Sequence, residues 1–361
     1  MHLEIQNYKK GSHQIHLYES QKCHYKFKNL FNCPEGRLGE YSREFTIPDQ
    51  FYVVSENAFL IPHSGNLVAF DEAGSFIQDS WPHKYGISKD ELGIIQDKAT
   101  KIRIIDAPED VFICSLIGGG NSYFHFFLDV LPRIFAAQDY SLRTSKRPLF
   151  LCDESLSPWM AQSLYFLGVT NHQILSYNVS LGEFAIRCKS LVSRRGHRCN
   201  EWDGDVPYDA LSPIDVKNLR EKLAQALRGY NFSNLPKKIL ISRNDSSSRR
   251  LLNQFAVMSK LGAEFQAISL SSMDLVEQIA IFKNASHIVA VHGAGLTNLI
   301  HSQNASVLEI HSNGHSIRPD FFQICGMNDL KYYFDVCNSV TPQHDVVASL
   351  ETIQKFKELS Y

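Results

Sequence analysis

The chain has 361 residues, 44% of them hydrophobic and 20% charged, which is typical of a globular protein long enough to form two domains. Its formal net charge of -2 at pH 7 gives no electrostatic basis for binding nucleic acid or an anionic membrane surface. The eight cysteines form no CxxC pair, which argues against a thiolate zinc site and a disulfide framework.

The N-terminal residues are polar and lack the apolar stretch of a signal peptide. No run approaches the roughly 18 to 20 apolar residues that cross a bilayer. We therefore expect a cytoplasmic protein without a transmembrane segment. Any association with the inner membrane face would be peripheral.

Residues 1–44 show no clear pattern, whereas short apolar stretches alternate with turn signals over 44–78 and predict a small antiparallel β meander. Its expected strands are 51–54, 58–61 and 67–70. Further on, strand and helix patterns alternate. Strands are expected at 111–116 and 147–151, and helices at 123–137 and 159–167. This alternation predicts a parallel sheet with helices on its faces.

A second α/β pattern follows residues 207–213, where Ser212 is placed to cap a helix that begins with Pro213. Strands at 238–241, 265–268, 287–291 and 306–310 then alternate with helices. This predicts a doubly wound domain over 213–335, with its ligand crevice at the carboxyl ends of the strands. We expect an N-terminal domain over 1–212 and a last helix, within 336–361, that packs back on that domain.

A glycine loop follows the third of these strands, reading VHGAGLTN over 291–298. Gly293 and Gly295 let the backbone approach a ligand, and the start of the next helix favours an anion. His292 and Thr297 can add hydrogen-bond donors to a phosphate. A structural tight turn explains the two glycines about as well. The loop lacks the GxxxxGK[ST] pattern, which argues against an ATPase.

Three further residues are candidates at the same sheet edge. Glu309 is expected to end a strand, where its carboxylate can accept the ribose hydroxyls of a nucleotide or simply be solvated. Arg243 follows the first strand of the domain, where its planar guanidinium suits a diphosphate. Arg249 belongs to the same run, ISRNDSSSRR over 241–250, and that run is equally compatible with a polar loop.

Another cluster precedes the second domain. Asn121, His125 and Asp129 are spaced four residues apart, so they share one face of a helix. A His–Asp pair one turn apart is a general-base arrangement in which the carboxylate holds the imidazole tautomer. The alternative is a buried structural network that ties the helix to a loop.

Taken together, three segments resemble the family 61 glycosyltransferases, whose bacterial members are often labelled capsular polysaccharide biosynthesis proteins. The segments are GNSYFHFFLDVLPRI at 120–134, ISRNDSSSRRLLNQ at 241–254 and VAVHGAGLTNLIHSQNASVLEI at 289–310. The resemblance covers roughly residues 45 to 335. It implies a GT-B-type fold of two Rossmann-like domains facing a cleft. It also implies inverting transfer from a nucleotide-sugar such as a UDP-sugar to a hydroxyl of a saccharide acceptor, lipid-linked saccharides included, in surface or capsular polysaccharide synthesis.

The resemblance also implies roles for individual residues. It places the nucleotide-sugar's diphosphate at Arg243 and the loop His292, Gly293, Ala294, Gly295, Leu296 and Thr297, and its ribose at Glu309. Asn121 and Arg249 are implied to line the acceptor side, with His125 or Asp129 as the base. After Glu309 the chain reads HSNGHSIRPDFF, where relatives more often have an aromatic, proline-rich loop, so the donor sugar stays open.

Enzymes of the GT-B type usually hold no metal, so we expect no metal site and no cofactor besides the nucleotide-sugar substrate. Asp203-Gly-Asp205 resembles a metal-binding DxD, but it lies in a joint rich in glycine and proline, which favours a loop. The 15 histidines form no HExxH or HxH spacing.

Two alternative functions remain. One is a dinucleotide-dependent oxidoreductase, although HGAG lacks the GxGxxG order, and the other is a non-catalytic scaffold that binds nucleotide-sugars.

Overall fold

The computed structural model describes residues 12–25, 29–30, 44–64, 66–77, 88–118, 122–178, 184–194 and 210–360. The chain divides into two compact units. The first comprises Met1–Gln21 and Ile47–Gly204, and the second comprises Lys22–Thr46 and Asp205–Tyr361. Asn121 and the Asp203-Gly-Asp205 segment lie outside the described residues.

The first unit is built on an eight-stranded mixed sheet in the order β1-β5-β11-β8-β9-β10, with β6 paired to β5 and β7 to β11. Strands β8, β9 and β10 run parallel, as expected, and β11 is parallel to β7 and β8 but antiparallel to β5. The strands are β1 Ser12–Tyr18, β5 Gln50–His63, β6 Asn66–Phe70, β7 Arg103–Asp106, β8 Val111–Ser115, β9 Arg147–Asp153, β10 Ile174–Tyr177 and β11 Phe184–Ser193.

The predicted separate meander is wrong in one respect, because its first two strands are a single strand, β5. The polar residues Ser55, Glu56 and Asn57 separate the two apolar stretches that were expected to be separate strands. In the structure Glu56 and Asn57 are exposed, and Asn57 takes a left-handed backbone angle (φ 50°) without ending the strand. Strand β5 pairs with β1, β6 and β11, so the hairpin is part of the large sheet.

The two helices predicted in the first unit, over 123–137 and 159–167, form near those positions, the first of them with an interruption; the helix over Lys89–Ala99 was not predicted. The helix expected over 123–137 is divided at Pro132 into a short α-helix, a π-turn and a longer α-helix. The helical segments are α2 Lys89–Ala99, α3 Tyr123–His125, η2 Phe126–Val130, α4 Arg133–Thr144, α5 Pro158–Phe166 and η3 Asn171–Gln173. A two-stranded sheet pairs β2 (Gln21–Cys23) with β4 (Phe45–Ile47).

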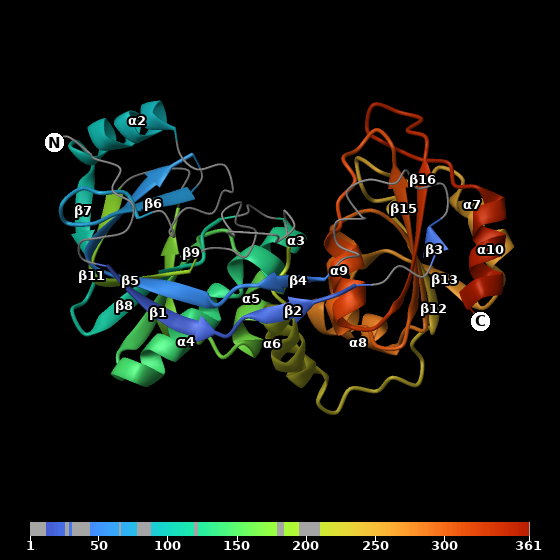
Figure 1. Ribbon diagram of the computed structural model, residues 1–361, viewed down its shortest axis with the longest axis horizontal. Helices are drawn as coiled ribbons and strands as arrows, with labels where there is room; N and C mark the ends of the chain where they lie inside the picture. The colour runs from blue at the N-terminus through green and yellow to red at the C-terminus, as the bar shows by residue number, and fades with distance from the viewer. Residues whose placement is uncertain are drawn as a thin grey trace. The chain divides into compact units, whose positions relative to one another are not determined.

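The second unit is a parallel six-stranded sheet in the order β13-β12-β14-β15-β16-β3. Its strands are β3 Asn29–Leu30, β12 Lys238–Ile241, β13 Phe265–Ile268, β14 His287–Val291, β15 Ser306–Ser312 and β16 Lys331–Cys337. Its helical segments are α6 Pro213–Leu223, η4 Ala224–Leu227, α7 Gln254–Leu261, η5 Leu270–Ser272, α8 Leu275–Asn284, η6 Ala294–His301, α9 Asp320–Met327 and α10 Leu350–Ser360. Helices α7 and α10 cover one face of the sheet and α8 and α9 the other (Figure 1).

Local sequence signals explain where these helices begin. The Ser212 Oγ accepts a hydrogen bond from the Asp215 N–H at 3.3 Å, and Pro213 occupies the first turn, as predicted. At the start of α8, Asp274 and Glu277 form a reciprocal capping box. These caps satisfy N–H groups that have no partner inside the helix.

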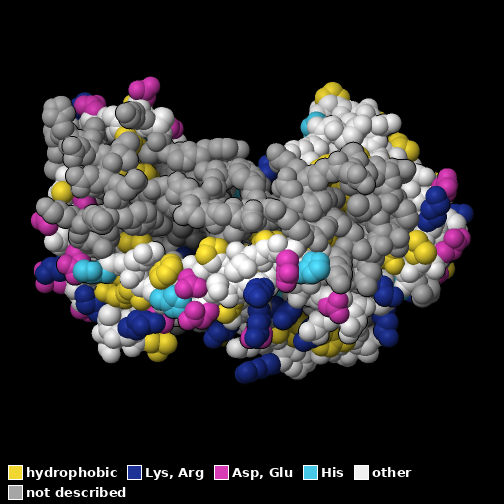
Figure 2. Space-filling model, viewed as in Figure 1, with side chains coloured by type: hydrophobic (Ala, Val, Ile, Leu, Met, Phe, Trp, Pro, Cys, Tyr) yellow, Lys and Arg dark blue, Asp and Glu magenta, His cyan; other side chains and the backbone are white. Residues whose placement is uncertain are grey.

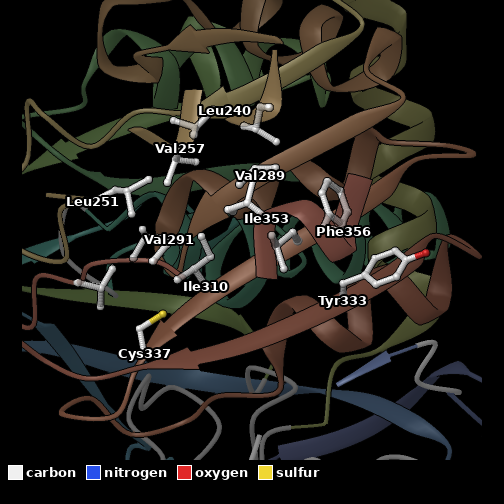
Figure 3. Packing of buried hydrophobic residues seen from close by; sticks show 14 of the residues in the cluster. Leu240, Leu251, Val257, Val289, Val291, Ile310, Tyr333, Cys337, Ile353 and Phe356 are labelled. Carbon is white, nitrogen blue, oxygen red and sulfur yellow. The ribbon is translucent and has the colours of Figure 1, made fainter. Parts of the chain in front are cut away.

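The last helix packs into the core of the second unit, whereas the prediction had it packing back on the N-terminal domain. Ile353 and Phe356 of α10 are fully buried in the second unit's own core, among Leu240, Val289 and Ile310 (Figure 3). The prediction that apolar residues of this segment form the buried side of a helix is confirmed. Their spacing, however, does not identify the surface against which the helix packs. Here the surface is the face of the second unit's sheet that α10 covers together with α7.

Charge is mixed on the described surface. On the face drawn in Figure 2, basic and acidic side chains lie next to one another in the described part. Among the described residues, no helix is both long and apolar enough to span a membrane.

Replacing Phe356 by alanine is predicted to destabilise the protein by about 3–5 kcal/mol, because the ring is fully buried in the core of the second unit. The matched control is Leu359→Ala on the same helix, where the side chain is 49% exposed and the change should stay within about 0.5 kcal/mol. Denaturant unfolding of both variants measures the difference. Equal effects would show that α10 is not anchored through Phe356.

Candidate functional site

The strand order of the second unit identifies where a ligand should bind. Numbered along the chain from β12, the strands lie in the order 2-1-3-4-5, so the direction of the chain reverses between β12 and β14. In open parallel sheets the ligand crevice lies outside the carboxyl ends of the strands at such a switch point. Arg243 follows β12 and the glycine loop follows β14, so the structure brings these predicted site residues to one place.

The guanidinium of Arg243 lies directly against the backbone of Gly293. A Cβ added to this glycine would come within 2.9 Å of the Arg243 Cζ and closer still to its Nη1. The Arg243 side chain is fixed by hydrogen bonds from Nε to the Arg249 carbonyl (3.1 Å) and from Nη2 to the Ser246 Oγ (2.9 Å). Gly293 is therefore required for the close approach of this arginine, and its φ of 172° is ordinary extended backbone.

Arg243 is positively charged and forms no ion pair within the described residues, although the nearby Asp245 carboxylate stabilises the charge. Burial lowers its pKa to about 10, so the group is protonated at neutral pH. Within the described residues, neither Arg243 nor Arg249 forms an ion pair, and each lowers the pKa of the buried His292. Arg250, by contrast, is paired with the buried carboxylate of Asp345 (Nη2 to Oδ2, 2.7 Å). Two of the three arginines thus present charge to the switch point.

The glycine loop continues into a 3-10 helix that begins at Ala294. Ala294 and Gly295 are half-exposed, so their backbone is accessible. The Leu296 N–H donates to the Gly293 carbonyl at 3.0 Å, and the Leu296 side chain is buried. This geometry does not support the predicted contact between Leu296 and a ligand. The Thr297 hydroxyl is enclosed within the structure rather than exposed at the edge.

Glu309 does not end its strand. Strand β15 continues to Ser312, so Glu309 lies in the middle of a central strand and is fully buried. Its Oε1 lies 2.5 Å from the His292 Nδ1, and its Oε2 accepts a hydrogen bond from the Tyr332 hydroxyl at 2.7 Å. Burial raises the pKa of Glu309 to about 7. With both oxygens engaged, the predicted direct contact with a ribose is not supported by this geometry.

Three histidines meet beside this network. His292 lies next to His311, with ring centroids 4.5 Å apart, and His315 is 5.6 Å from both. Burial lowers the pKa of His292 to about 3 and that of His311 to about 4, and it also lowers the pKa of the half-buried His315. All three rings are therefore neutral at pH 7. Spacing alone predicted no such cluster.

In the first unit the structure brings His125 and Asp129 together. The His125 Nδ1 lies 2.6 Å from the Asp129 Oδ2, one turn apart as the spacing indicates. The His125 side chain is 44% exposed, so the pair is not a buried network. Tyr123 and Phe127, on the other side of the same segment, pack on Trp159 of α5. The histidine is left facing outward.

The backbone around Asp129 forms a π-turn, a local distortion that often occurs at functional sites. Arg133 fixes this turn, because its Nε donates to the Asp129 carbonyl (3.2 Å) and its Nη1 to the carbonyls of Ser115 (3.1 Å) and Ile117 (3.2 Å). The guanidinium is buried and ties the turn to the end of β8. Sequence analysis did not select Arg133, although its position four residues after Asp129 was visible.

A family model described as Glycosyltransferase 61 matches residues 123–308, which is more than half of the chain. The chain belongs to the glycosyltransferase 61 family. No curated protein sequence matches it. The matched region of this glycosyltransferase contains His125, Asp129, Arg243 and the glycine loop, and it ends one residue before Glu309.

The Tyr332–Glu309 contact gives a test of how Glu309 is held. Tyr332→Phe is predicted to cost about 1.5–3 kcal/mol, because it removes a hydrogen bond to a buried carboxyl group. Tyr333→Phe, next in the chain, removes a hydrogen bond to the neutral Leu359 carbonyl and should cost about 0.5–1.5 kcal/mol. Denaturant unfolding compares the two. A smaller loss for Tyr332→Phe would mean that Glu309 does not depend on this bond.

Proposed function

We propose that this family 61 enzyme is an inverting glycosyltransferase that moves a sugar from a UDP-sugar to a hydroxyl of a saccharide acceptor in surface or capsular polysaccharide synthesis. We further propose that its two α/β units are the domains of a GT-B-type enzyme. The observation that carries the proposal is the unpaired charge of Arg243 against Gly293, at the switch point of a parallel sheet.

The diphosphate of the nucleotide-sugar is proposed to bind Arg243, Arg249 and the backbone of residues 293–295. Transfer breaks the bond between the anomeric carbon and the diphosphate oxygen, and the electron pair leaves with the UDP. The negative charge that develops there needs fixed positive groups. Arg243 is already held by three neutral acceptors, so little reorganisation is needed when the anion forms.

The acceptor hydroxyl must lose its proton as its oxygen attacks the anomeric carbon from the face opposite the diphosphate. We propose the His125–Asp129 pair as the base. In this arrangement the Asp129 carboxylate orients the imidazole through Nδ1, and Nε2 receives the proton. The half-exposed ring can be reached from solvent, which a buried structural histidine could not offer.

The diphosphate site predicts the effect of removing either arginine. Arg243→Ala and Arg249→Ala should each weaken UDP binding about 10- to 100-fold, the equivalent of one charge-assisted hydrogen bond. Gly293→Ala should do the same without removing a charge, because its Cβ displaces the Arg243 guanidinium. Isothermal titration calorimetry with UDP measures the affinities, and circular dichroism checks the fold.

The matched control is Lys260→Ala, which removes an exposed cation from α7 of the same unit and should leave the affinity unchanged. Unaltered UDP binding in both arginine variants would refute the site. Binding of NAD but not UDP by the unaltered protein would revive the oxidoreductase alternative.

The base assignment predicts a different outcome. Asp129→Asn and His125→Ala should each lower turnover by about 100- to 10,000-fold, because proton removal from the acceptor is lost. UDP affinity should stay nearly the same, since neither residue belongs to the proposed diphosphate site. Release of UDP from a panel of UDP-sugars gives the rate. The exposed His172 provides the control variant His172→Ala. Full activity in both test variants would eliminate the pair as the base.

A further inference from the structure

The three histidines at the carboxyl edge of the second sheet have the geometry of a ligand set. One ring nitrogen from each of His292, His311 and His315 lies within 4.8 Å of the others. His292 follows β14, His311 lies near the end of β15, and His315 lies on the loop beyond it. Two are buried and one is half-buried, so the cluster is accessible from one side.

Hydrogen bonds fix which nitrogen each ring can offer. The Nδ1 of His311 faces the Ser312 carbonyl at 2.9 Å, and the Nδ1 of His315 faces the Ser316 carbonyl at 3.0 Å. A carbonyl only accepts, so both Nδ1 atoms carry the hydrogen, and each neutral ring keeps its lone pair on Nε2. In its ionised form the Glu309 carboxylate only accepts, so it favours the same tautomer in His292.

The Nε2 of His311 adds an independent observation. This atom is buried, and it has no hydrogen-bond partner within the described part of the chain. Buried polar atoms are nearly always satisfied, so an unsatisfied one needs an explanation. A phosphate oxygen does not supply one, because a lone pair on Nε2 cannot donate to an anion. A metal ion does, because it accepts that lone pair.

We propose that His292, His311 and His315 bind one divalent transition-metal ion of the zinc class through their Nε2 atoms. Neutral imidazole suits Zn²⁺, Co²⁺, Ni²⁺ and Cu²⁺, whereas Mg²⁺ and Ca²⁺ prefer oxygen ligands. Three protein ligands leave a fourth position of a tetrahedral ion open. This assignment differs from the sequence-based expectation that the enzyme has no metal site.

The surroundings contain both favourable and opposing charges. Arg243 and Arg249 act against a cation, while Glu309 and Asp320 favour one. Zinc–nitrogen distances of about 2.0–2.1 Å place the nitrogens of a tetrahedral site about 3.4 Å apart, so the rings must approach one another slightly. His315 has the freedom to do so, because it is half-buried and lies on a loop.

Metal binding can be tested without any assay of sugar transfer. Metal-free full-length protein is titrated with Co²⁺ while its visible spectrum is recorded, and Zn²⁺ is then added in competition. We expect one Co²⁺ per chain, the intense d–d bands of a tetrahedral site, and displacement by Zn²⁺. Mg²⁺ should produce no displacement.

Variants locate the ion. His315→Gln and His311→Gln should each lower the affinity for Co²⁺ at least 100-fold, and Glu309→Gln about 10- to 100-fold through the loss of ring orientation. The control is His16→Gln. His16 forms the only other cluster of potential ligands among the described residues, with the exposed Glu19 and Asp49. This variant should bind Co²⁺ normally.

Two results would overturn the assignment: no stoichiometric tetrahedral Co²⁺ in the unaltered protein, or Co²⁺ binding that survives His315→Gln and is lost in His16→Gln. Circular dichroism and thermal melting verify that each variant is folded, and His315→Gln is the safer variant because its side chain is only half-buried. UDP binding that persists without Co²⁺ binding would reject the metal site and leave the proposed transferase function intact.

Discussion

The candidate site of the second unit depends on the close contact between the Arg243 guanidinium and the backbone of Gly293. Parallel pairing of β12 with β14 sets Ile241 beside Ala290, which brings the residues that follow each strand to the same edge. Only a residue without a Cβ leaves room for the guanidinium at this point. The contact therefore places a fixed cation next to accessible backbone at the topological switch point, where parallel α/β sheets bind their ligands.

A buried polar network lies beneath this contact. Glu309 sits in the middle of a central strand, where an unpaired carboxylate would be strongly unfavourable. His292 and Tyr332 engage its two oxygens, so side chains from the end of β14 and from β15 and β16 are linked through one group. Because His292 immediately precedes Gly293, the network also sets the start of the glycine loop. The network thus positions the glycine loop without any direct contact with a nucleotide.

Local sequence patterns predicted much of this arrangement. Strands β12 to β15 of the second unit, the Ser212 cap and the pairing of His125 with Asp129 all follow from spacing within one segment, whereas β3 and β16 were not predicted. Long-range pairing determined the rest. Strand β15 extends through polar residues to Ser312 because it pairs with β16, which lies further along the chain, and that extension buries Glu309. The same reason explains β5, whose polar centre is held in the sheet by β1 and β11.

The histidine cluster could not be predicted from the sequence because it depends on the register between two strands. Register pairs Val291 with Ile310, so His292 and His311 become neighbours although no short motif contains both. The histidine cluster and the arginines lie at the same sheet edge, so a metal ion and a diphosphate bound there would interact electrostatically. A metal ion on the histidines and the cations of Arg243 and Arg249 repel one another in a partly buried site unless an anion lies between them. A bound diphosphate removes that repulsion. By thermodynamic linkage, the diphosphate then favours the ion to the same extent that the ion favours the diphosphate.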